Sequence, residues 1–260
     1  MQFRTLISGS SGNCVLLSAN NTNILIDCGT SGKNIAACLL NTGVSPTCID
    51  YILVTHEHSD HAQGVGVMSR RYDIPVIASI GTFENMEIGE LSYKNTIAFS
   101  DYHKFEINGI VVTPFEIPHD AAMPTGYRFD IDSRSCAVAT DMGHITAPVK
   151  DALCGCEVVI LESNYDENML MTGPYPYVLK RRIGGTHGHL CNDDAATLGC
   201  FLVRNNTKHI VLGHLSKENN SPETAYTTVA KEMDISGIKI GRDVMLSIAP
   251  RYSVGENAAS

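Results

Sequence analysis

The most constraining feature of this sequence is a histidine-rich segment that directly follows an apolar run. Residues 51–54 are Tyr-Ile-Leu-Val, and the segment Thr55-His56-Glu57-His58-Ser59-Asp60-His61 comes next. Three imidazoles and a carboxylate this close together offer the nitrogen and oxygen donors that first-row divalent ions prefer. In an extended segment His56 and His58 point the same way, while Asp60 and His61 open the following helix and turn elsewhere. The spacing therefore predicts a site for a pair of divalent metal ions.

An isolated His-x-His pair is more often a solvated turn or an incidental metal binder than a functional site. Further candidate ligands nevertheless follow at the ends of later predicted strands: His119, Asp141 and His214. Each has a structural alternative when taken singly, as a strand-end histidine, a helix-capping aspartate and a turn residue. Their joint occurrence at strand ends favours the metal site, because independent signals then point to one answer.

Hydrophobic periodicity predicts short strands interleaved with helices along nearly the whole chain. This pattern indicates an α/β (α+β) protein in which two sheets carry helices on their outer faces. No Pro-, Gly- and Ser-rich linker interrupts it, so we expect one domain over 1–250 and a flexible tail over 251–260. The expected strands are 2–7, 14–18, 23–27, 51–55, 76–78, 110–117, 127–131, 136–140, 158–162, 209–213 and 244–248, and the expected helices are 33–42, 61–72, 146–152, 177–183, 193–204 and 222–233.

Composition argues against a generic nucleic-acid-binding protein, a membrane protein and a secreted protein. A formal net charge of −9 argues against a protein coated with positive charge for generic nucleic-acid binding, although a locally basic cleft stays open. The apolar runs are far shorter than the roughly 20 residues that span a bilayer, and the N-terminus has no room for a signal-peptide core. The nine cysteines include no Cys-x-x-Cys pair, which fits a reducing compartment. We therefore expect a cytoplasmic protein that does not enter membranes.

The motif His56-x-His58-x-Asp60-His61 resembles the signature of the metallo-β-lactamase fold. That fold is a four-layer αββα sandwich with two metal ions at the edge where strands of both sheets end. The resemblance implies that one set of side chains binds the first metal, a second set binds the second metal, and Asp141 bridges them. The first set is His56, His58 and His119, and the second is Asp60, His61 and His214. Zn²⁺, Mn²⁺ and Fe²⁺ all suit such a site, and availability decides between them.

A closer resemblance is to the WalJ/YycJ subgroup of this fold, which is related in architecture to tRNase Z and to PhnP. One departure is Cys191, at a position where the subgroup has a serine, so the hydroxyl contact expected there is left open. The segments that carry the resemblance extend along more than 200 residues and are 8–13, 53–61, 118–122, 162–164, 180–182, 188–189 and 214–220.

The resemblance implies an activity, namely cleavage of phosphodiesters by a hydroxide that bridges the two metals. In the subgroup this is a 5′-to-3′ exonuclease activity on DNA duplex ends, and DNA is favoured over RNA as the partner. Asp60 is the expected proton acceptor, and His189 is expected to donate to the leaving or scissile phosphate.

Phosphate contacts are expected from three further places in the chain. A Gly-rich turn at Ser10, Ser11 and Asn13 would form an anion nest, with a plain strand-to-strand turn as the alternative. Arg181 and Arg182 belong to the most concentrated positive charge in the sequence, with a solvated helix face as the alternative. The remaining candidates for the lining of the cleft are Ser163, Asn164 and Lys217.

Other functions stay open, two enzymatic and one not. The enzymatic alternatives are a small-molecule cyclic phosphodiesterase like PhnP and an RNA-processing nuclease like tRNase Z. The long arm by which tRNase Z grips tRNA has no counterpart in this sequence. A regulatory binding protein of a two-component signalling system is the non-enzymatic alternative. A complete ligand set argues against it, because a purely structural metal needs no open coordination position. The sequence leaves the oligomeric state open.

Overall fold

The computed structural model describes residues 1–259, which form two mixed β-sheets and the helices that pack on them. The chain divides into two compact units. The first comprises Met1–Val111, Ala121–Thr125 and the segment from Pro250 onward, and the second comprises Val112–Asp120 and Gly126–Ala249. The two units are compact parts of the chain, and the single domain expected over 1–250 stays a prediction. Among residues 1–259, no helix combines the length and apolar character that crossing a membrane requires.

The first unit is built on a six-stranded sheet with strands in chain order. Strands β1 to β3 are antiparallel, whereas β3 to β6 are parallel. Parallel neighbours bring their carboxyl ends to the same edge, which places the segments after β3 and β4 side by side. The strands are β1 (Gln2–Ile7), β2 (Cys14–Ala19), β3 (Thr22–Ile26), β4 (Tyr51–Leu53), β5 (Val76–Ser79) and β6 (Thr96–Phe99). The helices are α1 (Gly32–Thr42), η1 (Pro46–Cys48), α2 (Ser59–Ala62), α3 (Val65–Tyr72), α4 (Ile80–Asn85) and η2 (Tyr93–Asn95).

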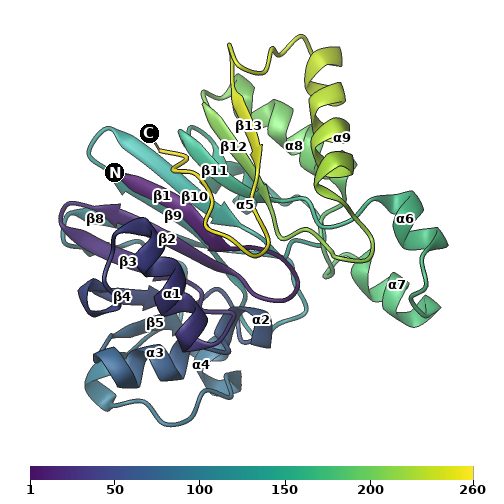
Figure 1. The fold of residues 1–260 in the computed structure, drawn as a ribbon. Helices are drawn as coiled ribbons and strands as arrows, with labels where there is room; N and C mark the ends of the chain where they lie inside the picture. Colours follow the sequence, from purple (N-terminus) through teal and green to yellow (C-terminus); the bar gives the residue numbers. More distant parts are fainter. Residues whose placement is uncertain (260) are drawn as a thin grey trace. The chain divides into compact units, whose positions relative to one another are not determined.

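Helices α1 and α3 cover one face of this sheet, where a buried apolar cluster joins them to the strands (Figure 1). Ile35 and Leu39 of α1 and Met68 of α3 belong to the cluster together with Leu25 and Ile52 of the sheet. Helix α1 begins at its cap Ser31, whose side chain accepts from the Asn34 N–H, and ends at Gly43 in the left-handed conformation. The strand ends are therefore held by a packed layer.

The other sheet has seven strands in the order β13-β12-β11-β10-β9-β8-β7. Strands β10 to β13 are parallel, and β9 is antiparallel to β10. The strands are β7 (Phe105–Ile107), β8 (Ile110–Glu116), β9 (Thr125–Ile131), β10 (Arg134–Ala139), β11 (Val158–Glu162), β12 (His209–Gly213) and β13 (Met245–Ile248). The helices of the second unit are α5 (Ala147–Leu153), α6 (Glu167–Thr172), α7 (Tyr177–Ile183), α8 (Asn192–Arg204) and α9 (Pro222–Ile235).

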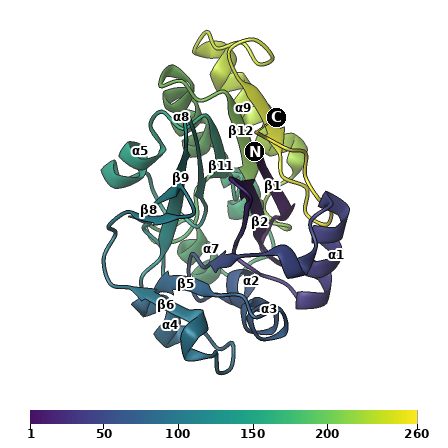
Figure 2. The same ribbon diagram turned by 90° about the vertical axis from the view of Figure 1, so that its left-hand side faces the viewer.

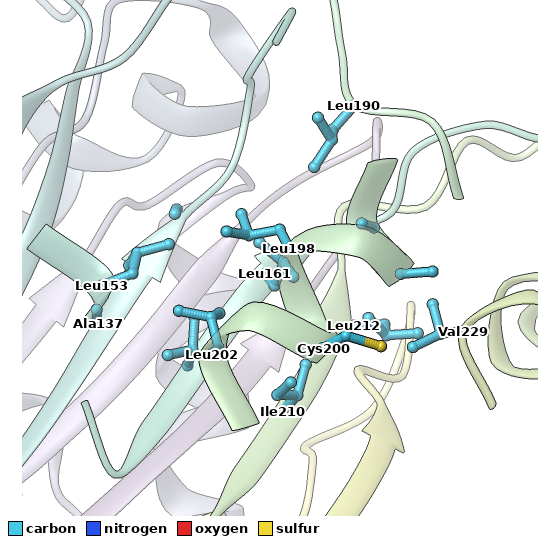
Figure 3. Close-up of a cluster of buried hydrophobic side chains, with 14 of the residues drawn as sticks. Ala137, Leu153, Leu161, Leu190, Leu198, Cys200, Leu202, Ile210, Leu212 and Val229 are labelled. Carbon is cyan, nitrogen blue, oxygen red and sulfur yellow. The ribbon is translucent and has the colours of Figure 1, made fainter. Parts of the chain in front are cut away.

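The core of the second unit lies between its parallel strands and helices α5, α8 and α9. Leu161 of β11 and Leu212 of β12 lie among Leu198 and Leu202 of α8, with Val229 of α9 beyond them (Figure 3). All these side chains are fully buried. Helices α6 and α7 stay outside this layer and project away from α8 and α9 as a separate pair (Figure 1).

Each expected strand and helix is present, and its ends lie within two residues of the expected ones, except for one helix that is divided in two. The helix expected over 61–72 is divided into α2 and α3 at Gly64. The Gly64 N–H donates to the Cys28 carbonyl at 2.7 Å, and a Cβ on Gly64 would lie 2.2 Å from the Thr30 carbonyl oxygen. The close approach of two backbone segments thus interrupts the helix. Strands β6 and β7 and helices α4 and α6 were not expected, because segments this short carry no periodic signal.

The last residues of the chain return to the first unit. The Gly255 and Ala258 N–H groups donate to carbonyls of β1, and Asn257 accepts from the Phe3 N–H. Figure 2 shows this C-terminal segment beside β1. Because Ala258 and Ala259 are buried, the tail buries more surface than the sequence suggested. Its flexibility stays a prediction.

Replacing Gly64 by alanine should be costly because the new methyl group would meet backbone rather than a movable side chain. We expect Gly64→Ala to lower the free energy of unfolding in urea by about 3 kcal/mol or more. Gly43→Ala is the control, since a Cβ there meets nothing within 4 Å and only the left-handed conformation resists it. That change should cost about 1 kcal/mol. Equal losses would contradict the close-approach explanation.

Candidate metal centre

The imidazoles of the first unit are positioned from the ends of β3 and β4. Asp27 follows β3 directly and is buried. Its carboxylate accepts from the Thr55 N–H at 2.8 Å and from the Thr55 hydroxyl at 2.9 Å. The predicted strand 51–55 therefore ends early, at Leu53, because Thr55 turns to this carboxylate. The turn starts the segment that carries His56, His58 and His61.

His61 is oriented by the same carboxylate. Its Nδ1 lies 2.8 Å from Asp27 Oδ2, and its ring is fully buried. A carboxylate on Nδ1 fixes the tautomer in which Nε2 carries the lone pair, the usual arrangement behind a histidine that ligates a metal. In this structure the Asn13 amide nitrogen lies 3.1 Å from Nε2. The Nε2 atom lies 3.7 Å from Asp60 Oδ2. Asp60 and His61 therefore present an oxygen and a nitrogen donor side by side.

The sequence alternation predicts that His56 and His58 point the same way, and in the structure their ring nitrogens lie close together. Nε2 of His56 lies 3.0 Å from Nδ1 of His58, and the rings meet edge to face. The other nitrogen of His56, Nδ1, lies 3.1 Å from the Thr55 hydroxyl. A separation near 3 Å suits two imidazole nitrogens that share one ion at about 2.0–2.1 Å from each.

In the second unit, three side chains gather at the ends of parallel strands β10, β11 and β12. Asp141 follows β10, Glu162 ends β11 and His214 follows β12. The register pairs Ala139 with Leu161 and Leu161 with Leu212, so the three side chains arrive at the same edge. Nδ1 of His214 lies 3.3 Å from Asp141 Oδ1.

Glu162 is the centre of this group. Its Oε1 lies 2.9 Å from His189 Nδ1 and 2.8 Å from His214 Nδ1. Its Oε2 accepts from the Met142 N–H at 2.6 Å and from the Leu190 N–H at 3.0 Å. Burial alone would raise the pKa of Glu162, but the charges and hydrogen bonds of the two histidines outweigh it and hold the pKa far below its usual range. A buried carboxylate thus orients two imidazoles at once.

His119 completes the donor set of the second unit. Its Nδ1 donates to the Gly188 carbonyl at 2.9 Å, and its Nε2 lies 3.8 Å from Asp141 Oδ1. Burial lowers the pKa of His119, which favours the neutral imidazole that a metal requires. The His189 ring lies 5.2 Å from the His119 ring and 5.3 Å from the His214 ring, and its side chain is more exposed than theirs, at 19 %.

Three residues of these groups adopt backbone conformations that side chains disfavour. Asp27, Asp141 and His214 each follow a strand with positive φ, at 62°, 63° and 54°. A non-glycine residue in this region costs of order 1 kcal/mol and persists only where the surroundings hold it. All three residues lie just after the carboxyl end of a parallel strand. Their strained backbone conformation directs the side chains to the edge of the sheet.

The donor chemistry of both units fits divalent metal ions. In the second unit Asp141, Glu162, His189 and His214 each offer a ligand atom, and these atoms lie within 4.8 Å of one another. Most of the imidazoles in both units are held on one nitrogen by a carboxylate or carbonyl, which leaves the other nitrogen for coordination. Imidazole and carboxylate ligands suit ions such as zinc and manganese.

Comparison with known proteins identifies the family. A family model described as "Beta-lactamase superfamily domain" matches residues 22–214. This chain belongs to the β-lactamase superfamily. It is 38% identical over 243 residues to exodeoxyribonuclease YycJ of Bacillus anthracis, covering 93% of this chain and 92% of that protein. It is 36% identical over 248 residues to exodeoxyribonuclease WalJ of Streptococcus pneumoniae, covering 93% and 91%. The predicted WalJ/YycJ resemblance is confirmed.

Solved structures of this superfamily confirm the metallo-β-lactamase fold. The protein YhfI of Bacillus subtilis, named a metallo-β-lactamase fold protein, aligns with a TM-score of 0.73 at 16% identity and covers 98% of this chain and 99% of its own. The short form of human tRNase Z aligns with a TM-score of 0.65 at 16% identity and covers 99% of both chains. A diphosphatase from the PhnP family aligns equally well, with a TM-score of 0.65 at 19% identity over 98% of this chain and 97% of its own.

The predicted substrate residues of the first unit differ in their surroundings. Ser10 and Ser11 are exposed in the turn between β1 and β2. Asn13 is buried instead, and its side chain bonds the Gly9 N–H and carbonyl and lies 3.1 Å from His61 Nε2. These contacts hold the turn and the His61 ring in place. The anion-nest role therefore depends on the two serines and stays a prediction.

The predicted substrate residues of the second unit also divide into buried and exposed groups. Ser163 donates to Asn192 at 2.6 Å, and Asn164 donates to the His214 carbonyl at 2.7 Å, both inside a buried network. These contacts hold the segment after β11 and the His214 turn. Arg182 forms an ion pair with Asp120 at 2.6 Å. Arg181 and Lys217 are exposed, and their substrate contacts stay predictions.

Cys191 lies at the start of α8, where the subgroup resemblance suggested a serine. It is the N-cap of that helix, and its sulfur accepts from the Asp194 N–H at 3.4 Å. Burial raises the pKa of Cys191 to about 11, so the thiol stays protonated and unreactive at neutral pH. In this structure the position caps a helix.

The residues that sequence reasoning did not assign to the site are Asp27, Thr55 and Glu162, which orient the histidines. A signal for two of them was present. Asp27 and Glu162 are acids at the carboxyl ends of apolar strands, where a carboxylate is costly unless it is paired. Such an acid next to a predicted histidine cluster indicates a partner for an imidazole.

Replacing Glu162 by glutamine should weaken metal binding without removing a ligand of the predicted set. We expect the affinity for Zn²⁺ or Mn²⁺ to fall by about 10- to 100-fold, because His189 and His214 lose the carboxylate that orients them. Competition against a chromophoric chelator measures this change, with circular dichroism to confirm folding. Glu157→Gln is the control, since Glu157 pairs with Arg134 away from the histidines. Equal affinities in Glu162→Gln and the parent would contradict the orienting role.

Replacing Cys191 by serine should stabilise the protein, because a hydroxyl is a stronger N-cap acceptor than a thiol. We expect the free energy of unfolding to rise by about 0.5–1 kcal/mol in urea titrations. Cys200→Ser, in the buried apolar face of α8, should instead destabilise by about 1–3 kcal/mol. A loss of stability in Cys191→Ser would show that the thiol is retained for its packing.

Proposed function

We propose that this protein is a metal-dependent phosphodiester hydrolase that acts as an exonuclease on DNA, in the 5′-to-3′ direction from duplex ends. The observation that carries the proposal is the set of imidazoles held at strand ends by buried carboxylates. Such pre-oriented nitrogen donors serve metal chemistry and are costly in a protein without it. Membership of the superfamily and identity to two exodeoxyribonucleases over more than nine-tenths of this chain support the same conclusion.

Two divalent ions are proposed, held by the seven side chains that the family resemblance implies. His56, His58 and His119 would hold one ion, Asp60, His61 and His214 the other, and Asp141 would serve both. Support comes from the donor chemistry within each unit and from the orienting groups behind His61, His119 and His214. Zn²⁺, Mn²⁺ and Fe²⁺ all accept imidazole and carboxylate ligands, so the physiological ion depends on availability.

When bound, the ions would supply positive charge against the phosphodiester and activate water as the nucleophile. The residues of the chain supply the proton transfers and the positioning. Asp60 is the proposed proton acceptor. Its side chain is 26 % exposed, whereas those of Asp27 and Asp141 are 3 % and 4 % exposed, so Asp60 is the carboxylate most open to water.

His189 is the proposed proton donor to the leaving oxygen. Its Nδ1 is held by Glu162 at 2.9 Å, which leaves Nε2 for the substrate. A carboxylate in this position fixes the tautomer and stabilises the imidazolium before it gives up its proton. The partial exposure of the ring allows a substrate oxygen to reach it.

The alternative functions differ in the substrate they predict. A cyclic phosphodiesterase would cleave small diesters but not DNA, an RNA-processing nuclease would prefer RNA, and a regulatory binding protein would cleave neither. DNA is favoured because YycJ and WalJ are named exodeoxyribonucleases. The cytoplasmic location stays a prediction.

The deciding experiment incubates the metal-loaded protein with duplex DNA labelled at one 5′ end, single-stranded RNA and a chromogenic diester. We expect stepwise release of nucleotides from duplex ends that stops on addition of EDTA. His58→Ala should abolish this release, whereas Lys33→Ala, at an exposed position of α1, should not change it. Hydrolysis of the chromogenic diester alone would contradict the nuclease proposal.

His189→Ala tests the proton-donor role separately. We expect about a 10²- to 10⁴-fold lower kcat on DNA, whose leaving oxygen needs a proton. On bis(p-nitrophenyl) phosphate the loss should be small, because nitrophenolate leaves without protonation. Equal losses on both substrates would show that His189 binds metal or holds structure instead.

A further inference from the structure

Helices α6 and α7 and the residues beside them line a half-open cavity of about 450 Å³ in the second unit. It lies on the helical pair that projects away from α8 and α9 (Figure 1). The volume is in the range of small-ligand sites. Its wall combines aromatic, apolar, acidic and basic groups: Tyr165, Glu167, Leu170, Met171, Tyr177 and Arg181 among them.

Tyr165 supplies a polar group inside this cavity. The residue is 7 % exposed, and a Cβ on Gly184 would lie 3.4 Å from its hydroxyl. Among residues 1–259, no side chain or carbonyl is hydrogen-bonded to that hydroxyl. Because Tyr165 lines the cavity, its hydroxyl can donate to or accept from a ligand there.

Tyr177 presents a face for stacking. It lines the same cavity at the start of α7, and 68 % of its surface is exposed. Met171, 62 % exposed, lines the cavity as well. An exposed aromatic ring beside a cavity suits a flat ligand, because nucleic-acid bases stack on aromatic side chains.

The charges favour a ligand with a negative end outside the cavity. Lys180 is occupied, since its ammonium donates to the Met171 and Gly173 carbonyls at 2.7 and 2.8 Å. Arg182 pairs with Asp120. Arg181 has no carboxylate partner in the part of the chain that the structure describes. Glu167 in the wall would accept from an N–H group of a base, such as N3–H of thymine, and would repel phosphate, which places a base inside and a phosphate at Arg181.

We propose that this α6–α7 cavity binds one unpaired nucleotide of the DNA strand, with the base on Tyr177 and the phosphate at Arg181. The inference rests on the proposed nuclease function, which it extends by naming a grip on a separated strand. A base in a duplex is covered by its partner and its stacked neighbours, so an unpaired nucleotide is the form that can place its base in this cavity. The turn after α7 connects the cavity to His189. The Ile183 carbonyl accepts from the His189 N–H, and the Gly185 carbonyl accepts from the Gly188 N–H, both at 2.9 Å.

The test measures binding of a fluorescein-labelled oligothymidylate to the full chain in EDTA by fluorescence polarisation. We expect Tyr177→Ala to weaken binding by about 5- to 100-fold. Arg181→Gln should weaken it as well and make the dependence on salt shallower, by about 0.7 in the slope of log K against log salt. Val178→Ala, exposed on α7 but outside the cavity lining, and Arg204→Gln, exposed at the end of α8, should bind like the parent.

An oligonucleotide of abasic residues with the same charge separates stacking from phosphate attraction. With this probe we expect Tyr177→Ala to bind as the parent does, while Arg181→Gln still binds more weakly. Parent-like binding of oligothymidylate by both cavity variants would overturn the proposal. Light scattering that shows a dimer broken by Tyr177→Ala would also overturn it, since the face would then dock a second copy.

Hydrolysis of bis(p-nitrophenyl) phosphate by the metal-loaded protein distinguishes the two proposals. Tyr177→Ala should cleave this small diester at the parent rate. If the diester is cleaved and the cavity variants bind DNA normally, the cavity proposal fails and the hydrolase function stands. If neither the diester nor duplex DNA is cleaved and the cavity variants lose oligothymidylate binding, the hydrolase function fails and the cavity proposal stands.

Discussion

The pairing of buried carboxylates with imidazoles is the interaction on which the rest of this structure depends. Asp27 holds His61 and Thr55, and Glu162 holds His189, His214 and two backbone N–H groups. A buried carboxylate is costly unless each oxygen finds donors, so these residues specify their surroundings closely. The same hydrogen bonds decide which imidazole nitrogen is left for a metal. Stability and coordination geometry are thus set by one set of contacts.

Parallel strands explain why these carboxylates are available at one edge of each sheet. The carboxyl ends of β3 and β4, and of β10, β11 and β12, lie in register, and the residues after them turn away with positive φ at Asp27, Asp141 and His214. Ligands in open α/β sheets bind at this end of the strands. The apolar layers of α1 and α3, and of α5, α8 and α9, hold the strands that carry the strained turns.

Much of this arrangement was predictable from local pattern. Alternation and apolar runs located β1, β11 and β12 to the residue. The spacing of His56 and His58 predicted side chains that point the same way, and their ring nitrogens lie 3.0 Å apart. The break at Gly64 was not predictable, because it depends on a backbone approach from residues 28–30. Glu162 was missed because its partners, His189 and His214, are distant in sequence and only the register of parallel strands brings them together. The buried contacts of Asn13 likewise depend on packing that no local pattern reports.

The central proposal is that these pre-oriented side chains hold two divalent ions that the hydrolase activity requires. The most direct measurement adds Mn²⁺ or Zn²⁺ stepwise to chelator-stripped protein and follows the bound metal per chain together with nucleotide release from duplex DNA. The account predicts two ions bound per chain and activity that rises with their occupancy. Full activity in stripped protein, or the absence of tight binding by folded protein, would contradict it.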